Sequence, residues 1–398
     1  MMTILSNKVT NMQESATLAM ARKSRELISK GKDIINLSLG EPDFNTPDFI
    51  KEAAKKAIDN NFSKYTPVAG YNDLLNVIVK KFKRDNNLTY EAKQIVCSTG
   101  AKQSIAQLLL VLLNSGDEVI LPAPYWVSYY QMIQLADGKA KTINTDIENN
   151  FKITAKQLEE SISNKTKVFL FSSPCNPTGS VYSKEELLEL SKVFAKHKDI
   201  IIISDEIYEH INFTKSHFSI GSIDKVKDQV VTVNGLSKGY AMTGWRFGYL
   251  GAPDKIASAC IKMQGQITSA TCSITQRAAI TALSTPPSKT QYMRTEFIER
   301  RNLVLQLLSE INGLNLNKPQ GAFYIFPNVK SFIGKSVNGL KIRNSSDLAM
   351  FLLTDAGVSV VAGSAFGTEN YIRISYAASK EQLISACKLI KISLGKIK

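Results

Sequence analysis

The most informative part of this 398-residue chain is Val230-Val-Thr-Val-Asn-Gly-Leu-Ser-Lys-Gly-Tyr-Ala-Met-Thr-Gly-Trp-Arg-Phe-Gly-Tyr-Leu250. Apolar runs rich in strand-forming residues stand at both ends, at 230–233 and 247–250, and a segment of small, turn-forming residues joins them. That segment carries one lysine, Lys238, and one arginine, Arg246. The pattern predicts two strands joined by a loop that holds both cations.

Lys238 is a candidate reactive lysine. An exposed lysine amine has a pKa of about 10.4, so a useful lysine needs burial or neighbouring cations that favour its neutral form. The small residues around Lys238 leave room for such a site. A neutral lysine can form a Schiff base with a carbonyl cofactor, as in pyridoxal phosphate enzymes, which also anchor the cofactor phosphate nearby. Arg246 is a candidate anchor, and the alternative is an ordinary surface lysine in a glycine-rich loop.

Length and composition are those of a large globular protein. The chain can bury a sizeable core, and contents of 44% hydrophobic and 21% charged residues are ordinary values. No apolar run approaches the roughly 20 residues that a membrane span needs. The segment from Met1 to Asn11 lacks the apolar core and cleavage site of a signal peptide. We therefore expect a cytoplasmic protein with no membrane partner.

The charged and metal-binding residue types argue against several classes of protein. The five cysteines are odd in number and form no C-x-x-C pair, which argues against disulfides and structural zinc. The three histidines, His197, His210 and His217, lack the usual metal-ligand spacings, so we expect no metal. The net charge is +14, but 39 of the 49 basic residues are lysines spread along the chain. We therefore expect no nucleic-acid partner, although the charge would steer anionic substrates toward the protein.

Short apolar runs alternate with helical patterns along the chain. The predicted strands lie at 93–97, 118–121, 167–172, 200–204, 230–233 and 247–250, and predicted helices lie at 101–114, 184–196 and 253–265. Apolar strands separated by helices predict an α/β protein with a mostly parallel sheet covered on both faces. Ligands of such sheets bind beyond the carboxyl ends of the strands.

The pattern changes after Pro286-Pro287, where a long polar helix is predicted at about 289–311. The segment at 36–47, punctuated by Gly and Pro, marks a second crossing between domains. We expect three parts: an N-terminal arm with part of the small domain at 1–47, a large domain at 48–288, and a small domain at 289–398.

Residues at the ends of the predicted strands suit a phosphorylated aromatic ring. Ser98-Thr-Gly-Ala-Lys-Gln103 opens a helix, and the N–H groups at Gly100 and Ala101 can receive a phosphate. The segment is neither a G-x-G-x-x-G nor a Walker A loop. Trp126 can stack on a flat ring, or it can pack in the core. Asn176 lies between two prolines and can donate to a phenolic oxygen, or it can belong to a plain turn.

Asp205 is stronger evidence for a cofactor site than these residues, because it is the last residue of a buried apolar strand. A carboxylate there pays a desolvation cost unless a cation faces it, and a protonated pyridine nitrogen would be such a cation. A structural ion pair is the alternative. Tyr208 can hydrogen-bond the other side of the ring together with Asn176. Arg373 lies in a strand-like alternation, and its guanidinium suits a carboxylate held by two hydrogen bonds, unless it is a solvated strand residue.

Together these residues resemble the class I aminotransferases of pyridoxal phosphate fold type I, in particular the bacterial aspartate aminotransferase branch. The resemblance extends over nearly the whole chain, to Arg373. The matching motifs are Leu37-Ser-Leu-Gly-Glu-Pro-Asp-Phe44, Lys64-Tyr-Thr-Pro67, Asn176-Pro-Thr-Gly179, Asp205-Glu-Ile-Tyr208, Ser237-Lys238 and Gly321-Ala-Phe-Tyr324. The resemblance implies a large cofactor-binding domain with a mostly parallel seven-stranded sheet flanked by helices, and a smaller α+β domain. It also implies a homodimer whose active sites are shared across the interface.

The resemblance further implies the roles of individual residues. As catalytic residues, Lys238 would bind pyridoxal 5'-phosphate covalently, Asp205 would keep its pyridine nitrogen protonated, and Tyr208 would bind its phenolic oxygen with Asn176. Trp126 would stack on the ring. The other implied cofactor-binding residues are Gly100, Ala101, Lys102, Ser237, Arg246 and, from the partner subunit, Tyr65. The implied substrate-binding residues are Gly40, Trp126, Asn176 and Arg373, with Lys102 for a distal carboxylate.

The implied reaction is a ping-pong transfer of the amino group from L-aspartate to 2-oxoglutarate, which gives oxaloacetate and L-glutamate. Its partners would be small dicarboxylic amino acids and 2-oxo acids. Aromatic or prephenate aminotransferases and C–S lyases share the cofactor residues and stay open as alternatives. Gln13-Glu14 stands where prephenate-active relatives often carry a basic residue, and Gly235 where some relatives carry serine. A ligand-binding regulator would need a DNA-binding domain, for which the roughly 35 residues before the first motif are too few.

Overall fold

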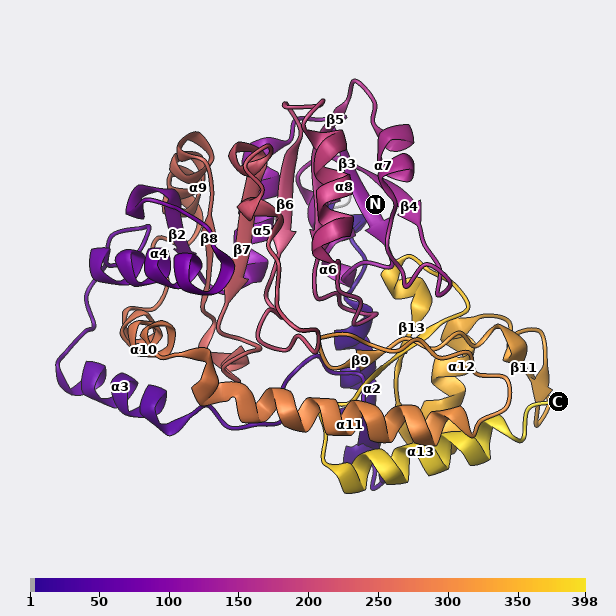
Figure 1. Ribbon diagram of the computed structural model, residues 1–398. Coiled ribbons are helices and arrows are strands. Elements are labelled where there is room, and N and C mark those ends of the chain that lie inside the picture. Colours follow the sequence, from indigo (N-terminus) through magenta and orange to yellow (C-terminus); the bar gives the residue numbers. More distant parts are fainter. Residues whose placement is uncertain (1–3) are drawn as a thin grey trace.

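A seven-stranded sheet is the centre of the protein in the computed structural model, which describes residues 4–398 (Figure 1). The first three residues of the predicted 1–47 segment lie outside the described part. The strands are β2 (Ile95–Ser98), β3 (Glu118–Ala123), β4 (Lys139–Asn144), β5 (Thr166–Ser172), β6 (Ile201–Asp205), β7 (Val230–Gly235) and β8 (Gly248–Gly251). They are ordered β2-β8-β7-β6-β5-β3-β4, and only β8 is antiparallel to its neighbours. The predicted mostly parallel sheet is confirmed.

The central strands are apolar on both sides because helices cover both faces of the sheet. In β5, Val168 and Leu170 pack on one face, and Phe169 and Phe171 pack on the other. The first face is covered by α5 (Ala101–Leu112), α6 (Val127–Leu135) and α9 (Asp254–Ile267). The second face is covered by α7 (Ala155–Ser161) and α8 (Lys184–Phe194), and toward β2 by α3 (Asp48–Asp59), α4 (Asn72–Asn86) and α10 (Ser273–Ser284). The central strands therefore bury nearly all of their side chains, which explains their continuous apolar sequences.

The predicted elements agree with the structure to within a few residues at each end. The one strand of the large sheet that is not predicted is β4, whose sequence Lys-Ala-Lys-Thr-Ile-Asn is polar because the strand lies at the edge of the sheet with one neighbour. The predicted helix at 289–311 begins as a short turn of 3₁₀ helix at Pro287–Thr290 and continues as α11 (Gln291–Ser309).

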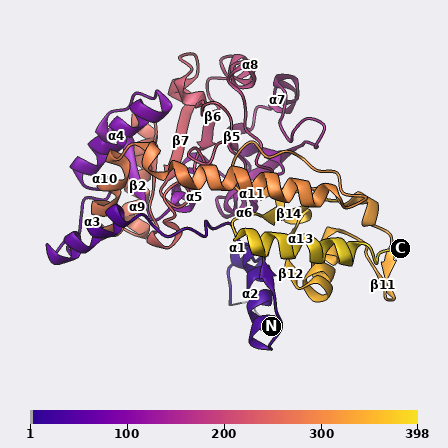
Figure 2. The same ribbon diagram turned by 60° about the horizontal axis from the view of Figure 1, so that its bottom comes forward.

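A second core lies beside the large sheet and is built mainly from the C-terminal residues. It contains α11, α12 (Ser345–Phe351), α13 (Lys380–Leu394) and the three-stranded sheet β13-β14-β9, whose strands are β13 (Val361–Ala362), β14 (Ile372–Ser375) and β9 (Tyr324–Ile325). Figure 2 shows α11 and α13 side by side along this part. The remaining short pairs are β1 (Ile35–Asn36) with β12 (Val358–Ser359), and β10 (Ser336–Val337) with β11 (Leu340–Lys341). The predicted domain limits at 47 and 288 stay predictions.

The N-terminal segment joins this second core. It forms the short helix α1 (Asn7–Thr10) and the longer helix α2 (Ala16–Ser29), and then β1 pairs with β12. The backbone of Leu37 continues the pairing by donating to Ser359 and accepting from Ser375. Residues 38–40 are thereby held next to β14, close to the carboxyl ends of the large sheet. Among the described residues, no helix combines the length and the apolar character that crossing a membrane requires.

Candidate active site

A cavity of about 280 Å³ lies where the loops after the large sheet meet the N-terminal segment and β14. Eleven of the thirteen predicted site residues line it. They are Gly40, Ala101, Lys102, Trp126, Asn176, Asp205, Tyr208, Ser237, Lys238, Arg246 and Arg373. The two exceptions are Gly100, which directly precedes the lining residue Ala101, and Tyr65, whose side chain is 98% exposed in the single chain.

Lys238 lies in the loop after β7, and its environment favours the neutral amine. Burial lowers its pKa to about 8; Arg373 and Arg246 lower it as well, while Glu41 opposes them. The Nζ atom donates a hydrogen bond to the carbonyl oxygen of Gly40 at 2.5 Å. This places the amine at the boundary between the large sheet and the N-terminal segment.

Asp205 ends β6 and is buried, with its carboxylate facing the cavity. Burial raises its pKa to about 6, although two hydrogen bonds to the carboxylate oppose this shift. The hydroxyl of Tyr129 donates to Oδ2 at 2.6 Å, and the backbone N–H of Ile207 donates to Oδ1 at 3.2 Å. A cation beside this carboxylate would stabilise its ionised form and lower the pKa again.

Arg373 is the most buried cation of the site, with 1% of its surface exposed. Its guanidinium donates to Asn176 Oδ1 at 2.9 Å and to the carbonyl oxygen of Ser38, and it lies 4.5 Å from the ring centroid of Tyr324. The Nε atom is buried without a hydrogen-bond partner. In the described part of the chain, no carboxylate forms an ion pair with Arg373. A guanidinium in this state suits an anionic ligand.

The opposite end of the cavity is shaped by glycines and a second arginine. Gly100 precedes α5 in the left-handed region, with φ of 88°, and a Cβ atom there would overlap the guanidinium of Arg246. A Cβ atom at Gly248 would overlap the backbone of Gly100 and Ala101. The amino end of α5, the hydroxyl of Ser237 and the Arg246 guanidinium are therefore brought together. This donor set suits a phosphate.

Lys102 and Trp126 form a third part of the lining. The Nζ atom of Lys102 lies 5.0 Å from the ring centroid of Trp126. Burial lowers the pKa of Lys102, and the nearby Arg246 lowers it as well. The indole also packs edge-on against Tyr129, with ring centroids 5.4 Å apart. Trp126 therefore lies between the Asp205–Tyr129 pair and a free cation.

The side chains of Asn176 and Tyr208 each form a hydrogen bond within the protein. Asn176 accepts from Arg373, and the Tyr208 hydroxyl lies 2.7 Å from that of Tyr324. Sequence reasoning missed Tyr129 and Tyr324 as site residues, and also Ser15 and Thr17 of the N-terminal segment, which line the cavity. Tyr324 stands in a quoted motif, but no pattern in the sequence connects Tyr129 with Asp205.

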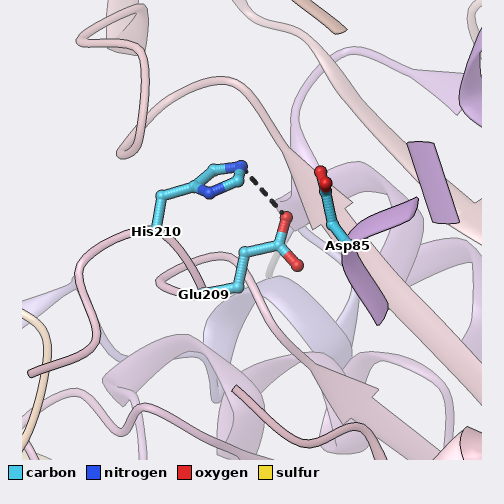
Figure 3. Close-up of side chains that lie close together, drawn as sticks. All are labelled: Asp85, Glu209 and His210. Atoms are coloured by element: carbon cyan, nitrogen blue, oxygen red, sulfur yellow. Dashed lines mark ion pairs between the residues drawn. The ribbon is translucent and has the colours of Figure 1, made fainter. Parts of the chain in front are cut away.

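The structure also brings histidines and carboxylates together in two groups. Asp85, Glu209 and His210 lie close together, and Figure 3 shows His210 directed toward Glu209, with 3.3 Å between Nε2 and Oε1. Glu209 also belongs to a group with Glu206 and His217. Glu206, Glu209, His210 and His217 are close in sequence, but spacing along the sequence could not reveal that Asp85 joins them. Lys81 forms an ion pair with Glu209 and already supplies a cation there.

The cavity fits pyridoxal phosphate on its own chemistry. The glycine-lined amino end of α5, together with Ser237 and Arg246, suits the phosphate, and the buried Asp205 suits a protonated pyridine nitrogen. Lys238 has a lowered pKa and lies in the same cavity. The residues present therefore suit the phosphate, the ring nitrogen and the carbonyl carbon of the cofactor.

Comparisons with known proteins agree with this chemistry. The family model described as aminotransferase class I and II matches residues 32–390. The probable aspartate/prephenate aminotransferase of Rickettsia felis is 46% identical over 399 residues, which cover 100% of this chain and 98% of the relative. The crystal structure of the aspartate aminotransferase from Rhizobium meliloti has a TM-score of 0.96 at 37% identity and covers 100% of both chains. The aspartate aminotransferase of Thermus thermophilus with maleate has a TM-score of 0.93 at 36% identity, covering 98% of this chain and 100% of that chain.

Replacement of Tyr129 by phenylalanine tests the hydrogen bond to Asp205. We expect the acidic limb of the pH profile of turnover to move to higher pH, because the lost bond stabilised the ionised carboxylate. A bond to a charged group is worth about 1.5–3 kcal/mol, which corresponds to a rise of about one to two units in the pKa of Asp205. Tyr130→Phe removes a neighbouring hydroxyl that does not contact Asp205 and should leave the limb in place. An unmoved limb in Tyr129→Phe would contradict the expectation.

Proposed function

Because the chain belongs to the class I and II aminotransferases, and is a pyridoxal-phosphate-dependent enzyme of the bacterial aspartate aminotransferase type, we propose that it transfers the amino group of L-aspartate to 2-oxoglutarate. The products would be oxaloacetate and L-glutamate. The observation that carries the proposal is the charge of the cavity. Four cationic side chains line it, and Asp205 is its only acidic lining residue among those described. The cations are Lys102, Lys238, Arg246 and Arg373.

The excess of cations supports a substrate with two carboxylates. Arg246 is next to the proposed phosphate site, which leaves Arg373 and Lys102 for the substrate. We assign the α-carboxylate to Arg373, because its buried guanidinium lacks an acidic partner and Asn176 orients it. The backbone of Gly40 lines the cavity close to this position. We assign the distal carboxylate to Lys102, which lies over Trp126. The name of the Thermus thermophilus structure mentions maleate, a dicarboxylic acid, bound to a related protein.

The remaining lining residues would hold the cofactor and move protons. Bound pyridoxal phosphate supplies a carbonyl carbon that accepts the amino group and a ring that withdraws electrons from the substrate. Gly100, Ala101, Ser237 and Arg246 would hold its phosphate, and Trp126 would cover one face of its ring. Asp205 would keep the ring nitrogen protonated, and Tyr208 with Asn176 would donate to its phenolic oxygen.

Lys238 is the residue that we propose to move the proton. With a pKa of about 8, a substantial fraction of its amine is neutral in mildly alkaline solution, so the amine can both take a proton from the substrate α-carbon and return it. Its hydrogen bond to Gly40 places the amine beside the proposed α-carboxylate site. The same residue can therefore serve both halves of a ping-pong reaction.

We further propose that the active site is completed by a second copy of the chain. Tyr65 is 98% exposed and does not line the cavity of its own chain. Ile58 and Ile267 are also large apolar residues that are more than half exposed. A symmetric partner that covers this surface would bury these side chains and could place its Tyr65 near the phosphate site.

Prephenate is a second candidate amino acceptor, because the Rickettsia felis relative is named for both aspartate and prephenate. Prephenate also carries two carboxylates and would use the same cations. Glu14 argues against it, because this acid directly precedes the lining residue Ser15. Glu14 forms an ion pair with Arg22 at 3.0 Å, which partly offsets its charge.

The amino donor can be identified from the bound cofactor alone. We expect L-aspartate, added without an oxo acid, to change the visible absorption band of the purified holoenzyme. We expect L-tyrosine and L-cystine to change it much more slowly. A band that responds to tyrosine or cystine but not to aspartate would replace the aspartate assignment with an aromatic aminotransferase or a C–S lyase. Prephenate is then added to enzyme whose cofactor has already received the amino group, and a return of the original absorption band identifies it as an acceptor.

Lys102→Gln tests the assignment of the distal carboxylate. Loss of a charge-assisted hydrogen bond should raise KM for aspartate about tenfold or more, while KM for alanine, which has no distal carboxylate, should change little. Steady-state kinetics measure the ratio of the KM values for aspartate and alanine in the variant and in the parent enzyme. An equal change for both donors would assign Lys102 to the cofactor rather than to the substrate.

Tyr65→Ala tests the shared site. We expect a particle of twice the chain mass in solution, and a variant that loses bound cofactor faster during dialysis, although Tyr65 is exposed in the single chain. Tyr292→Ala serves as the control, because Tyr292 is another exposed tyrosine, with 51% of its surface accessible, and lies outside the cavity. A monomeric particle, or equal cofactor retention in both variants, would contradict the proposal.

A further inference from the structure

A second cavity, of about 350 Å³, lies behind the active site and shares no lining residue with it. One wall is the loop that follows Tyr208, from Glu209 to His217, and the other is the junction between the 3₁₀ turn at Pro287–Thr290 and α11. The mechanism proposed above uses none of its residues. Its unpaired polar atoms and its charge decide what it can bind.

Asn212 provides a buried donor without a partner. Its side chain is 5% exposed, and its Nδ2 atom makes no hydrogen bond. The amide orientation follows from its other atom, because Oδ1 accepts from the backbone N–H of Thr214 at 2.9 Å and from the Thr214 hydroxyl at 2.7 Å. The Nδ2 group of this cavity residue is therefore a donor that needs an acceptor.

Of the two histidines in the cavity, His217 adds a second buried polar atom that lacks a partner among the described residues. His217 Nε2 lies 2.8 Å from Glu206 Oε2, and its Nδ1 atom is buried and unpaired. Although burial lowers the pKa of His217, Glu206 and Glu209 raise it more, so the pKa is raised overall. A protonated His217 carries an Nδ1–H donor. His210 Nε2, by contrast, lies 3.3 Å from Glu209 Oε1, and burial lowers the pKa of His210.

The cationic side chains of the cavity are Lys215 and Arg294. Arg294 is fixed against the loop, because its Nε donates to the carbonyl oxygen of Asn212 at 2.5 Å and its Nη2 to that of Thr214 at 3.4 Å. Glu209 is the single acidic lining residue among those described. It is neutralised from behind by Lys81, which is fully buried, and the pKa of Glu209 is held at about 2 despite its burial.

The other charged groups of this region face one another. Glu206 accepts from Ser204, Ser219 and His217, and Asn86 donates to both Glu206 and Glu209. Asp85 pairs with Arg84. The acids therefore have partners within the protein, and the unpaired groups are donors and cations.

We propose that this second cavity binds a small oxyanion, either inorganic phosphate or a free carboxylate. The anion would accept from Asn212 Nδ2 and from the His217 ring, and it would be attracted by Arg294 and Lys215. It would thereby satisfy buried donors that have no partner in the protein. The site is separate from the proposed substrate and cofactor sites and does not depend on the identity of the amino donor.

The chain offers a direct readout, because it has only three histidines. Ring signals of His210 and His217 are followed by NMR in the holoenzyme during titration with phosphate, and separately with acetate, at constant ionic strength. His197 is a built-in control, because it pairs with Glu159 on the surface and does not line this cavity. We expect saturable shifts at His210 and His217, no shift at His197, and a rise of about one unit in the pKa of His217.

Asn212→Asp is the decisive variant. It keeps the oxygen that accepts from Thr214 and replaces the free donor by a negative oxygen, so saturable binding should be lost. Lys215→Gln should weaken binding about tenfold. Lys225→Gln removes an equal charge from an exposed lysine outside the cavity and should bind as the parent does. The absorption of the bound cofactor reports whether each variant is folded. If the Asn212→Asp protein does not fold, the binding measured with Lys215→Gln tests the proposal instead.

The outcomes separate the two sources of the anion. Saturable shifts with phosphate alone identify a phosphate site, and shifts with acetate alone identify a carboxylate site; shifts with both identify a general oxyanion site. The proposal is overturned by equal drift of all three histidines, by no shift with either anion, or by unchanged binding in a folded Asn212→Asp or Lys215→Gln protein.

Discussion

Arg373 is buried with no acidic partner among residues 4–398, and the rest of the active site depends on this constraint. Removing a guanidinium from water costs several kcal/mol unless hydrogen bonds and a counter-charge replace the water. In the protein the replacement is incomplete: Asn176 and the Ser38 carbonyl accept two hydrogen bonds, and the rings of Tyr324 and Phe366 lie 4.5 and 5.0 Å away. These groups come from parts of the chain far apart in sequence. Arg373 is therefore correctly placed only when the large sheet, the N-terminal segment and the C-terminal core are all folded and packed together.

The same low-dielectric cavity brings the pKa values of an acid, Asp205, and a base, Lys238, closer together. Burial raises the pKa of Asp205 to about 6 and lowers that of Lys238 to about 8, because in each case burial disfavours the charged form. Both groups consequently change protonation within about one pH unit of neutrality, whereas exposed groups of these types titrate about three units away from it. The Tyr129 hydroxyl limits the shift of Asp205 by donating to its carboxylate. Without that bond the carboxylate would hold a proton at higher pH and would stabilise a neighbouring cation less well.

The sequence predicts the parts of the fold and site that are local, and it misses those that depend on distant contacts. The strand that ends at Asp205 is recognisable because both of its faces are buried, and Lys238 is recognisable from its small neighbours. The edge strand β4 has a mixed polar sequence and a single neighbour, so its pattern is weak. The Tyr129–Asp205 bond spans 76 residues and the Lys81–Glu209 pair spans 128, and neither leaves a spacing that a single sequence could reveal.

The segment from Asp205 to His210 links the two cavities physically. Asp205 and Tyr208 line the active-site cavity, whereas Glu209 and His210 line the second one, and Glu206 lies in the buried network beside it. The segment is therefore fixed from both sides, by Tyr129 and Tyr324 in front and by Lys81 and Asn86 behind. Breaking a buried ion pair by removing one partner costs about 3–5 kcal/mol, because the other charge is left unpaired. The Lys81–Glu209 pair thus limits movement of the backbone next to Tyr208. His210 also packs against Gly239, where a Cβ atom would overlap its ring, so the second cavity adjoins the residue that follows Lys238.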